Sequence, residues 1–142
     1  MRQVKHLLVD KGGEIVSTSA EAPVLVAITL MAEHHVGALL VMHGDRLAGI
    51  ISERDYARKV VLKGRSSAAT PVSEIMTSKV ITVGPEDTVD HCMRVCTDHR
   101  IRHLPVLDGT RVVGVLSIGD LVKAVISEQS EQIEHLQRYL AS

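Results

Sequence analysis

The chain has 142 residues, 45% of them hydrophobic, and its 16 Lys and Arg against 17 Asp and Glu give a formal net charge of −1. This length suits one domain with a real core, and the balanced charge lacks the basic excess of most nucleic-acid-binding domains. From the charge balance we expect no nucleic-acid partner. No apolar run approaches the roughly 18 residues that cross a bilayer, so we also expect no membrane partner and a cytoplasmic location.

The first part of the chain predicts five elements in the order strand, helix, strand, strand, helix. They are expected at residues 15–18, 23–35, 38–42, 47–52 and 54–62. Val24, Ala27 and Met31 recur at spacings of three and four residues, which is typical of an amphipathic helix. Gly44 lies between the two consecutive strands and predicts a hairpin turn.

The same order of elements recurs after a stretch rich in Gly, Ser and Ala. The second set is expected at residues 80–83, 89–99, 103–107 and 111–117, with a last helix from 120 to about 140. Sliding the chain by 65 positions aligns residues 16–60 with residues 81–125 without a gap. The identical pairs include Glu21/Glu86, Val24/Val89, His34/His99, Leu39/Leu104, Gly44/Gly109, Gly49/Gly114, Ser52/Ser117 and Asp55/Asp120. The chain is therefore an internal duplication.

The duplication predicts the domain organisation. We expect a first repeat with its lead-in at residues 1–63, a linker at 64–73, a second repeat at 74–128 and a helical extension at 129–142. A repeat of about 60 residues is marginal on its own. The fold class expected is therefore α/β (α+β), with two βαββα repeats packed as one module.

A Ser-x-x-Asp spacing closes the second strand of each repeat and opens the following helix. Ser52 and Ser117 fall where a helix N-cap is wanted, and Asp55 and Asp120 follow three residues later. A carboxylate there can accept hydrogen bonds from both hydroxyls of a ribose diol, and free helix N–H groups can donate hydrogen bonds to a phosphate. The alternative is a capping box that stabilises each helix by about 1 kcal/mol.

Two signatures in register resemble the cystathionine β-synthase (CBS) domain family. They read Gly-Ile-Ile-Ser-Glu-Arg-Asp at residues 49–55 and Gly-Val-Leu-Ser-Ile-Gly-Asp at residues 114–120, both of the pattern Gly-apolar-apolar-Ser-x-x-Asp. The segments at residues 102–108 and 73–77 also look like family elements. The resemblance implies two repeats around a pseudo-twofold axis, two clefts that bind AMP, ATP or NAD-type compounds, and a flat homodimer.

The resemblance also implies which residues serve the clefts. The candidates are Ser17, Thr18, Ser52, Arg54, Asp55, Thr82, Val83, Arg102, His103, Ser117 and Asp120. Family geometry groups Thr18 with Asp120 and Thr82 with Asp55. The second repeat has Arg102 and His103 where the first has Gly37 and Ala38, so we expect the two sites to be inequivalent. Solvated surface charge is the alternative for any single Arg or Lys.

Cys92 and Cys96, with histidines nearby, raise the alternative of a metal or redox site. The repeat aligns these cysteines with Ala27 and Met31, which predicts buried small side chains instead. No nucleotide-binding glycine loop and no nucleophile turn is found. We therefore expect no metal and no catalysis.

The function predicted is a regulatory, non-catalytic module that senses an adenine nucleotide, with a protein target that the sequence does not name. The alternative is a constitutive homodimeric scaffold with vestigial clefts. A metal-dependent enzyme built on the cysteines is a third hypothesis. The last helix is the candidate for a surface that faces a partner or a second copy.

Overall fold

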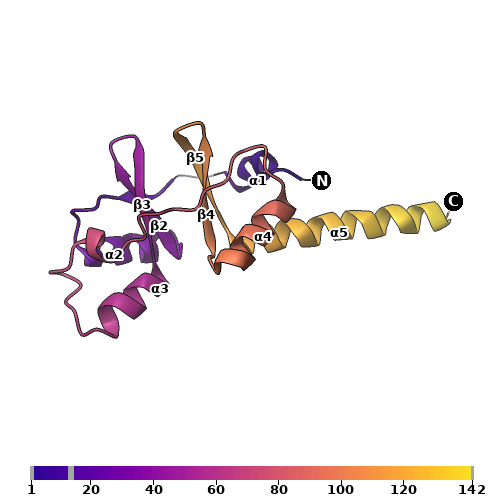
Figure 1. The fold of residues 1–142 in the computed structure, drawn as a ribbon. Coiled ribbons are helices and arrows are strands. Elements are labelled where there is room, and N and C mark those ends of the chain that lie inside the picture. Colours follow the sequence, from indigo (N-terminus) through magenta and orange to yellow (C-terminus); the bar gives the residue numbers. More distant parts are fainter. Residues whose placement is uncertain (1, 13–14, 142) are drawn as a thin grey trace. The chain divides into compact units, whose positions relative to one another are not determined.

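The computed structural model describes residues 2–12 and 15–141, and it contains the predicted repeat of strands and helices preceded by one unexpected helix (Figure 1). The described residues form two compact units. The first-repeat unit holds residues 15–81 and 108–113, and the second-repeat unit holds residues 2–12, 82–107 and 114–141. The predicted mixed class of helices and short sheets is confirmed. The boundaries 1–63, 64–73, 74–128 and 129–142 stay a prediction.

The first long helix of each repeat, α2 (Val24–His34) and α4 (Val89–His99), buries one apolar face. The buried residues are Val24, Ala27 and Met31 in α2, and Val89, Cys92 and Cys96 in α4. These positions match across the repeat, so the prediction that both cysteines lie in the core is confirmed. Each helix is followed by a residue in the left-handed conformation, His35 with φ 53° and Arg100 with φ 55°.

The strands of the first repeat form a three-stranded sheet in the order β1-β2-β3. The bounds are Ser17–Thr18 for β1, Ala38–His43 for β2 and Arg46–Ser52 for β3. β1 runs parallel to β2, and β2 runs antiparallel to β3 through the turn at Gly44, whose φ is 62°. The alternating burial of β3 is typical of a strand with one face on the core.

The second repeat has the corresponding hairpin of β4 (His103–Asp108) and β5 (Arg111–Ser117). The strand predicted at residues 80–83 is reduced to one parallel bridge between Val83 and Val106. Val83 N donates to Pro105 O and Val83 O accepts from Leu107 N, as in a parallel strand, but the residues beside Val83 do not extend this ladder.

The segment predicted as a linker packs tightly in the first-repeat unit. Thr70 O accepts a hydrogen bond of 2.8 Å from Val24 N, and Val72 N donates to Ala22 O at 2.8 Å. Val72, at the start of the short 3-10 helix η2 (Val72–Glu74), and Ile75 both lie in the buried core cluster of this unit. Thr77 then pairs with Ile50 of β3. We call residues 70–77 the first cover.

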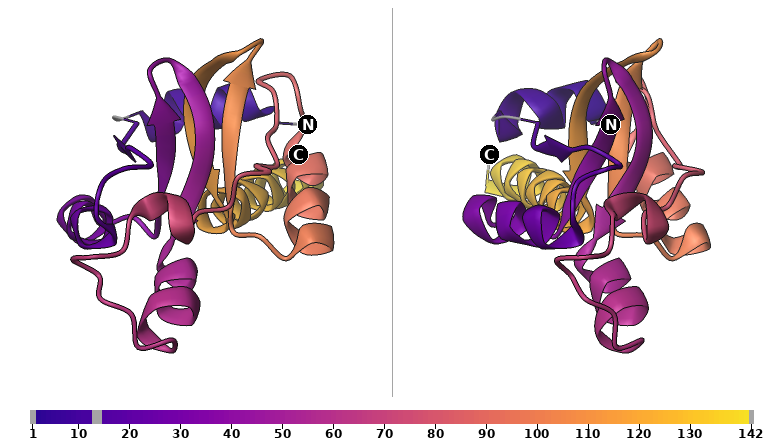
Figure 2. Two further views of the ribbon diagram at one scale, coloured as in Figure 1. Left: turned by 60° about the vertical axis from the view of Figure 1, so that its left-hand side comes forward. Right: turned by 90° about the vertical axis from the view of Figure 1, so that its left-hand side faces the viewer.

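Helix α1 (Val4–Lys11), which the sequence analysis missed, performs the same task in the second-repeat unit. Val4 N donates to Asp87 O at 2.8 Å and Lys5 N donates to Pro85 O at 3.0 Å. Val4 and Leu7 are buried, and the helix lies beside β5 (Figure 2). We call residues 3–11 the second cover. Each cover therefore packs on one repeat and stands in the sequence just before the other. The first cover precedes the second repeat but packs on the first, and the second cover precedes the first repeat but packs on the second.

The covers explain why each family-like signature opens with glycine. A Cβ placed on Gly49 would lie 2.8 Å from Thr77 O, and one placed on Gly114 would lie 2.5 Å from Leu8 Cδ2. Both separations are shorter than van der Waals contact allows. At Gly49 the obstacle is the backbone of the first cover, whereas at Gly114 it is the end of the flexible Leu8 side chain.

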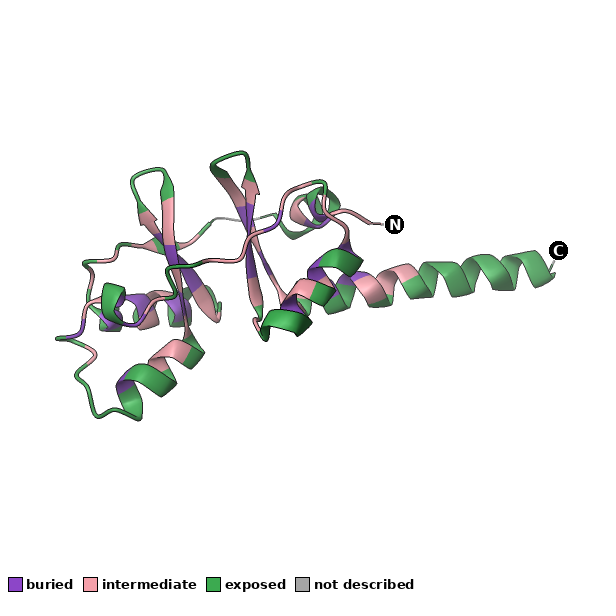
Figure 3. Cartoon of the chain, viewed as in Figure 1, coloured by how far each residue is buried: buried purple, intermediate pink, exposed green. Residues whose placement is uncertain are grey.

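The helices that follow the signatures differ in length. α3 (Glu53–Tyr56) continues into the π-helix η1 (Ala57–Val61), whereas α5 runs from Ile118 to Ala141 without a break. The outer turns of α5 are exposed throughout (Figure 3). No helix within the described ranges is long and apolar enough to cross a membrane.

Candidate functional site

The Ser-x-x-Asp motif of the first repeat forms a closed capping box at the start of α3. Asp55 Oδ2 accepts hydrogen bonds from Ser52 N at 2.9 Å and from Ser52 Oγ at 3.0 Å, and Asp55 N donates to Ser52 Oγ at 3.2 Å. Glu53 N donates to Gly37 O at 3.0 Å. The motif therefore forms the capping box that the capping interpretation predicted, and a backbone hydrogen bond joins the start of α3 to the residue before β2.

The second repeat reproduces this geometry at the start of α5. Asp120 Oδ2 accepts from Ser117 N at 2.8 Å, and Asp120 N donates to Ser117 Oγ at 3.1 Å. Ile118 N donates to Arg102 O at 2.8 Å, which matches the bond to Gly37 O in the first repeat. Both carboxylates are consequently held at one orientation, with 16% of the Asp55 side chain and 27% of the Asp120 side chain exposed.

Each carboxylate also has a lysine ammonium beside it. Lys59 Nζ lies 3.2 Å from Asp55 Oδ1 and donates to Ile75 O at 2.8 Å. Lys11 Nζ donates to Asp120 Oδ2 and to Val115 O, both at 2.8 Å. In both repeats the ammonium thus joins the helix-start carboxylate to a backbone carbonyl.

The charge of Asp120 follows from these contacts. Burial acts to raise the pKa of its carboxyl, but hydrogen bonds from Lys11 and Ser117 and the positive charge of Lys11 outweigh burial and hold the pKa below the ordinary value of 3.8. Asp120 is therefore an anion at neutral pH, and its oxygens can only accept hydrogen bonds.

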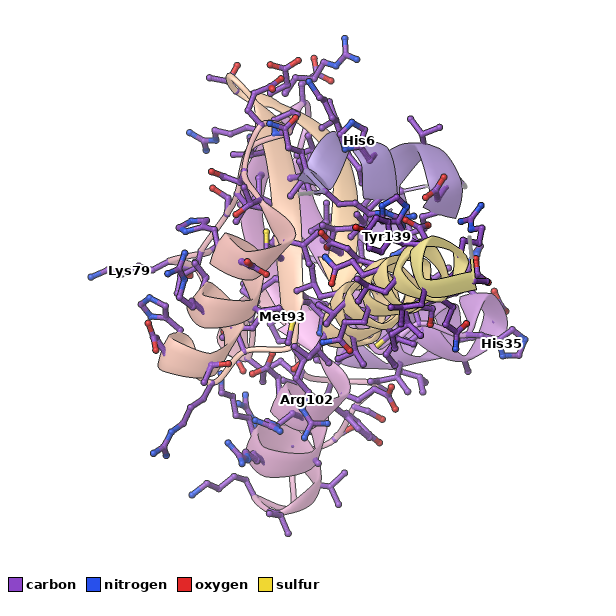
Figure 4. All side chains as sticks on the ribbon, turned by 90° about the vertical axis from the view of Figure 1, so that its right-hand side faces the viewer. His6, His35, Lys79, Met93, Arg102 and Tyr139 are labelled. Carbon is purple, nitrogen blue, oxygen red and sulfur yellow. The ribbon has the colours of Figure 1, made fainter. Side chains whose placement is uncertain are left out.

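His103 and Arg102 stand close to Asp120 and differ from each other in charge and exposure. Burial lowers the pKa of His103, the charges of Lys11 and Arg102 lower it further, and Asp120 acts in the opposite direction. The imidazole is neutral at pH 7 and can offer one donor and one acceptor. Arg102 is exposed (Figure 4), and its guanidinium adds a second positive charge to that of the Lys11 ammonium beside Asp120.

The remaining candidates lie at strand edges or on the helix surface. Ser17 and Thr18 form β1, with Thr18 half-buried, and Arg54 is exposed on α3. Thr82 is half-buried, whereas Val83 is buried and its N–H already donates to Pro105 O at 3.1 Å. Val83 therefore has a structural role in addition to any contact with a ligand.

Each unit brings together a subset of the predicted residues. The first-repeat unit joins Ser52 to Asp55, and the second-repeat unit joins Ser117, Asp120, Arg102 and His103. The groupings of Thr18 with Asp120 and of Thr82 with Asp55 join residues of different units, and they stay predictions.

Sequence reasoning missed the role of Lys11. The position that matches Lys59 in the second repeat is Ala124, so the repeat itself points to a missing ammonium. The residue that supplies it lies 109 positions from Asp120, and no local pattern links the two.

Cys92 and Cys96 have the properties of core residues. Burial raises the pKa of Cys92 to about 11, with further increases from the charges of Asp87 and Cys96, and burial also raises the pKa of Cys96. Few thiolates form at neutral pH under these conditions. In the part of the chain that the structure describes, no three His, Cys, Asp or Glu residues are grouped to hold a metal ion.

Comparison with known proteins places these units in a wider context. The family model for the CBS domain matches the chain twice, at residues 4–62 and at residues 72–127. The CBS domain-containing protein CBSX3, mitochondrial, of Arabidopsis thaliana is 48% identical over 119 residues, which cover 80% of this chain and 58% of that relative. The chain thus matches less than two thirds of that relative's length.

Two solved structures are informative. A protein with CBS domains from Burkholderia ambifaria MC40-6 is 54% identical, with a TM-score of 0.86 and coverage of 90% of this chain and 96% of that one. The CBS domain pair of protein MJ0100, in complex with 5′-methylthioadenosine and S-adenosyl-L-methionine, is 25% identical, with a TM-score of 0.80 and coverage of 90% and 98%.

Proposed function

Because the chain belongs to the CBS domain family, we propose that it is a regulatory, non-catalytic module that binds an adenine-containing small molecule such as AMP, ATP or NAD. The observation that carries this proposal is the pair of fixed, partly exposed carboxylates at matched positions of the two repeats. The similar CBS pair of protein MJ0100 holds two adenosine compounds, which supports a ligand of this class.

In the proposed complex, Asp55 and Asp120 accept hydrogen bonds from ribose hydroxyls. Ser52 and Ser117 hold these carboxylates in place, as their capping bonds do in the free protein. The guanidinium groups of Arg54 and Arg102 are suited to phosphate oxygens. His103 contributes a neutral hydrogen bond because its pKa is lowered.

The segments that precede the first helices supply the remaining contacts in this proposal. Ser17 and Thr18 would face the adenine edge of the ligand held by Asp120, and Thr82 and Val83 would face that of the ligand held by Asp55. The two sites are expected to differ in affinity, because only the second repeat carries the Arg102-His103 pair.

Ligand binding regulates only when the ligand favours one conformation over another. We propose that two copies of the chain associate, that the occupied form alters binding of a protein target, and that the protein needs no metal. A cytoplasmic location stays a prediction, and the name of the Arabidopsis relative assigns that protein to mitochondria.

The proposal is tested by thermal shift and calorimetry with AMP, ADP, ATP, NAD and S-adenosylmethionine, with GTP as the control ligand. A ligand at 100 times its dissociation constant adds about 2.7 kcal/mol to the free energy of unfolding. Asp55→Ala and Asp120→Ala are expected to weaken binding, each at its own site. Asp98→Ala removes an exposed carboxylate of α4 and is expected to leave affinity unchanged.

One observation favours the scaffold alternative. Both carboxylates already accept hydrogen bonds from a capping serine and have an ammonium neighbour. Their negative charges are therefore compensated without a ligand. A flat ligand panel on folded, nucleotide-free protein would support the scaffold and contradict the sensing proposal.

A further inference from the structure

The outer half of α5 carries apolar side chains that its own unit leaves uncovered. The exposed fractions are 58% for Ile126, 55% for Ile133, 58% for Leu136 and 81% for Leu140. Every described residue from 129 to 141 is exposed, as the end of the helix in Figure 3 shows. The family model ends at residue 127, so most of this surface is an addition of this chain to the family module.

The exposed residues follow a regular spacing. Positions 122, 126, 129, 133, 136 and 140 are separated by alternating steps of four and three residues, and they hold Val, Ile, Gln, Ile, Leu and Leu. This is the a/d pattern of a coiled coil, whose period of 3.5 residues keeps one seam facing a partner helix. We call residues 126, 129, 133, 136 and 140 the α5 seam.

The outer segment of α5 has no apolar face packed on its own unit, because every described residue from 129 to 141 is exposed. Most helical stability in proteins comes from the packing of such a face. Beyond residue 128, Glu131 of α5 forms an exposed ion pair with Arg2 at 3.2 Å. Such a surface pair contributes about 0–1 kcal/mol.

The residues that flank the seam are compatible with a second copy of the same helix. The positions that flank a coiled-coil core include Ser130, Gln132 and Gln137, which are uncharged, whereas Glu131, Glu134 and Arg138 lie on the outer positions of the heptad. A partner chosen by charge would require charged flanks. Two copies of this helix meet without like-charge repulsion, so the pattern fits a second copy of the same chain.

Gln129 sets the orientation. In a parallel pair in register, Gln129 faces Gln129 of the second copy, and the two amides can bond to each other. In the antiparallel pair that aligns the same seam, Gln129 faces Ile133 and its amide is left against a hydrocarbon side chain, which is costly. Ile126 and Ile133 at a, with Leu136 at d, also suit a parallel two-stranded coiled coil.

We propose that the α5 seam forms a parallel, in-register, two-stranded coiled coil with the α5 seam of a second copy of this chain. The inference rests on the proposed pairing of two chains and specifies its surface. It does not depend on ligand binding.

Sedimentation of the full chain at micromolar concentration tests the surface. The wild type is expected to be a dimer, and Ile133→Asp is expected to raise the dissociation constant by about 100-fold or more, because it buries an unpaired carboxylate. His135→Asp adds the same group to the opposite face of the same turn and is expected to leave the dimer unchanged. Circular dichroism checks that each variant is folded.

The outcomes distinguish a failure of the proposed pairing from a failure of the α5 seam as its surface. A wild type that is monomeric at all concentrations overturns both the pairing and the seam. A dimer that survives Ile133→Asp leaves the pairing intact and overturns the seam as its surface, which would point to another part of the same chain or another partner as the cover of α5.

Oxidative cross-linking tests the orientation. Leu136→Cys is expected to give a disulfide-linked dimer, since the two cysteines would face each other across the seam. In the antiparallel arrangement Leu136 faces Ile126, and the two cysteines stand about 15 Å apart along the helix. Glu134→Cys on the outer face is the control. Cross-linking of the control but not of Leu136→Cys would overturn the parallel seam.

Discussion

Asp55 and Asp120 occupy matched positions in the two repeats, but the lysines beside them come from different parts of the chain. Lys59 stands four residues after Asp55 on the same helical segment. Lys11 reaches Asp120 from α1, which lies at the other end of the sequence. In the second repeat the position of Lys59 is taken by Ala124, which is buried.

This comparison shows what is constant between the repeats. The backbone capping bonds are the same, and so is the placement of an ammonium between a carboxylate and a carbonyl oxygen. The source of the ammonium is free to change as long as one is supplied. The charge balance of the second site consequently depends on the docking of α1, and that of the first site depends only on its local helix.

The largest effect on stability is expected from substitutions at the two glycines that face the covers, and its size should differ between them. Gly49→Ala is expected to lower the free energy of unfolding by about 3 kcal/mol, because the new methyl group would meet the backbone oxygen of Thr77, which cannot easily move. Gly114→Ala is expected to cost about 1 kcal/mol, because the obstacle is the flexible side chain of Leu8. Urea unfolding measures both. Equal costs would contradict the assigned difference between the covers.

An intermediate effect is expected from the two lysines. Lys11→Met and Lys59→Met each remove a partly exposed ion pair and should each lower the free energy of unfolding by about 1 kcal/mol. Lys11→Met should also loosen α1, which amide hydrogen exchange of residues 4–11 would detect. Lys59→Met is the matched control and should leave that exchange unchanged.

The pH dependence of the Lys11→Met effect has a defined sign. Because the pKa of folded Asp120 lies below 3.8, the stabilisation by the pair is complete above the pKa of the unfolded chain and is lost as pH falls through the folded value. The difference in stability between wild type and Lys11→Met should therefore be constant near neutrality and shrink in acid. A difference that persists at low pH would show that Lys11 acts by packing and not by charge.

The smallest effect expected concerns His103, which the first repeat replaces with Ala38. The pKa of folded His103 lies below 6.5, so the neutral ring is part of the stable fold above that pH. Stability should fall as pH drops below the unfolded pKa, since the unfolded chain then binds a proton more readily. His103→Gln should reduce this loss in urea unfolding at pH 5 to 7. An unchanged pH profile would contradict the assigned burial effect.

The repeat pattern predicted most elements because their periodicity and turn residues are local. The helices at residues 23–35 and 89–99 and the two hairpins appear where apolar spacing and Gly44 and Gly109 indicated them. The π-helix η1 was missed, because its apolar spacing does not differ enough from that of an α-helix. Helix α1 was missed because much of its stability comes from β5 and the segment before α4, which are distant in sequence.

The candidate site was predictable to a similar degree. The Ser-x-x-Asp spacing correctly indicated a capping box in both repeats, since that interaction spans three residues. The ammonium beside Asp120 and the hydrogen bonds of Val83 required knowledge of the packed chain. The ligand roles of all the candidate residues remain predictions for the binding experiments.

The exchange of covers has a consequence for the order of events during synthesis on the ribosome. Residues 2–12 are made before the strand that receives them, β5, which follows about one hundred residues later. The first cover is available to the first-repeat unit as soon as residue 77 has left the exit tunnel. Only residues 108–113 of that unit are made later. The segment of residues 2–12 therefore cannot dock on β5 until about one hundred further residues have been made, and its docking comes after that of the first cover.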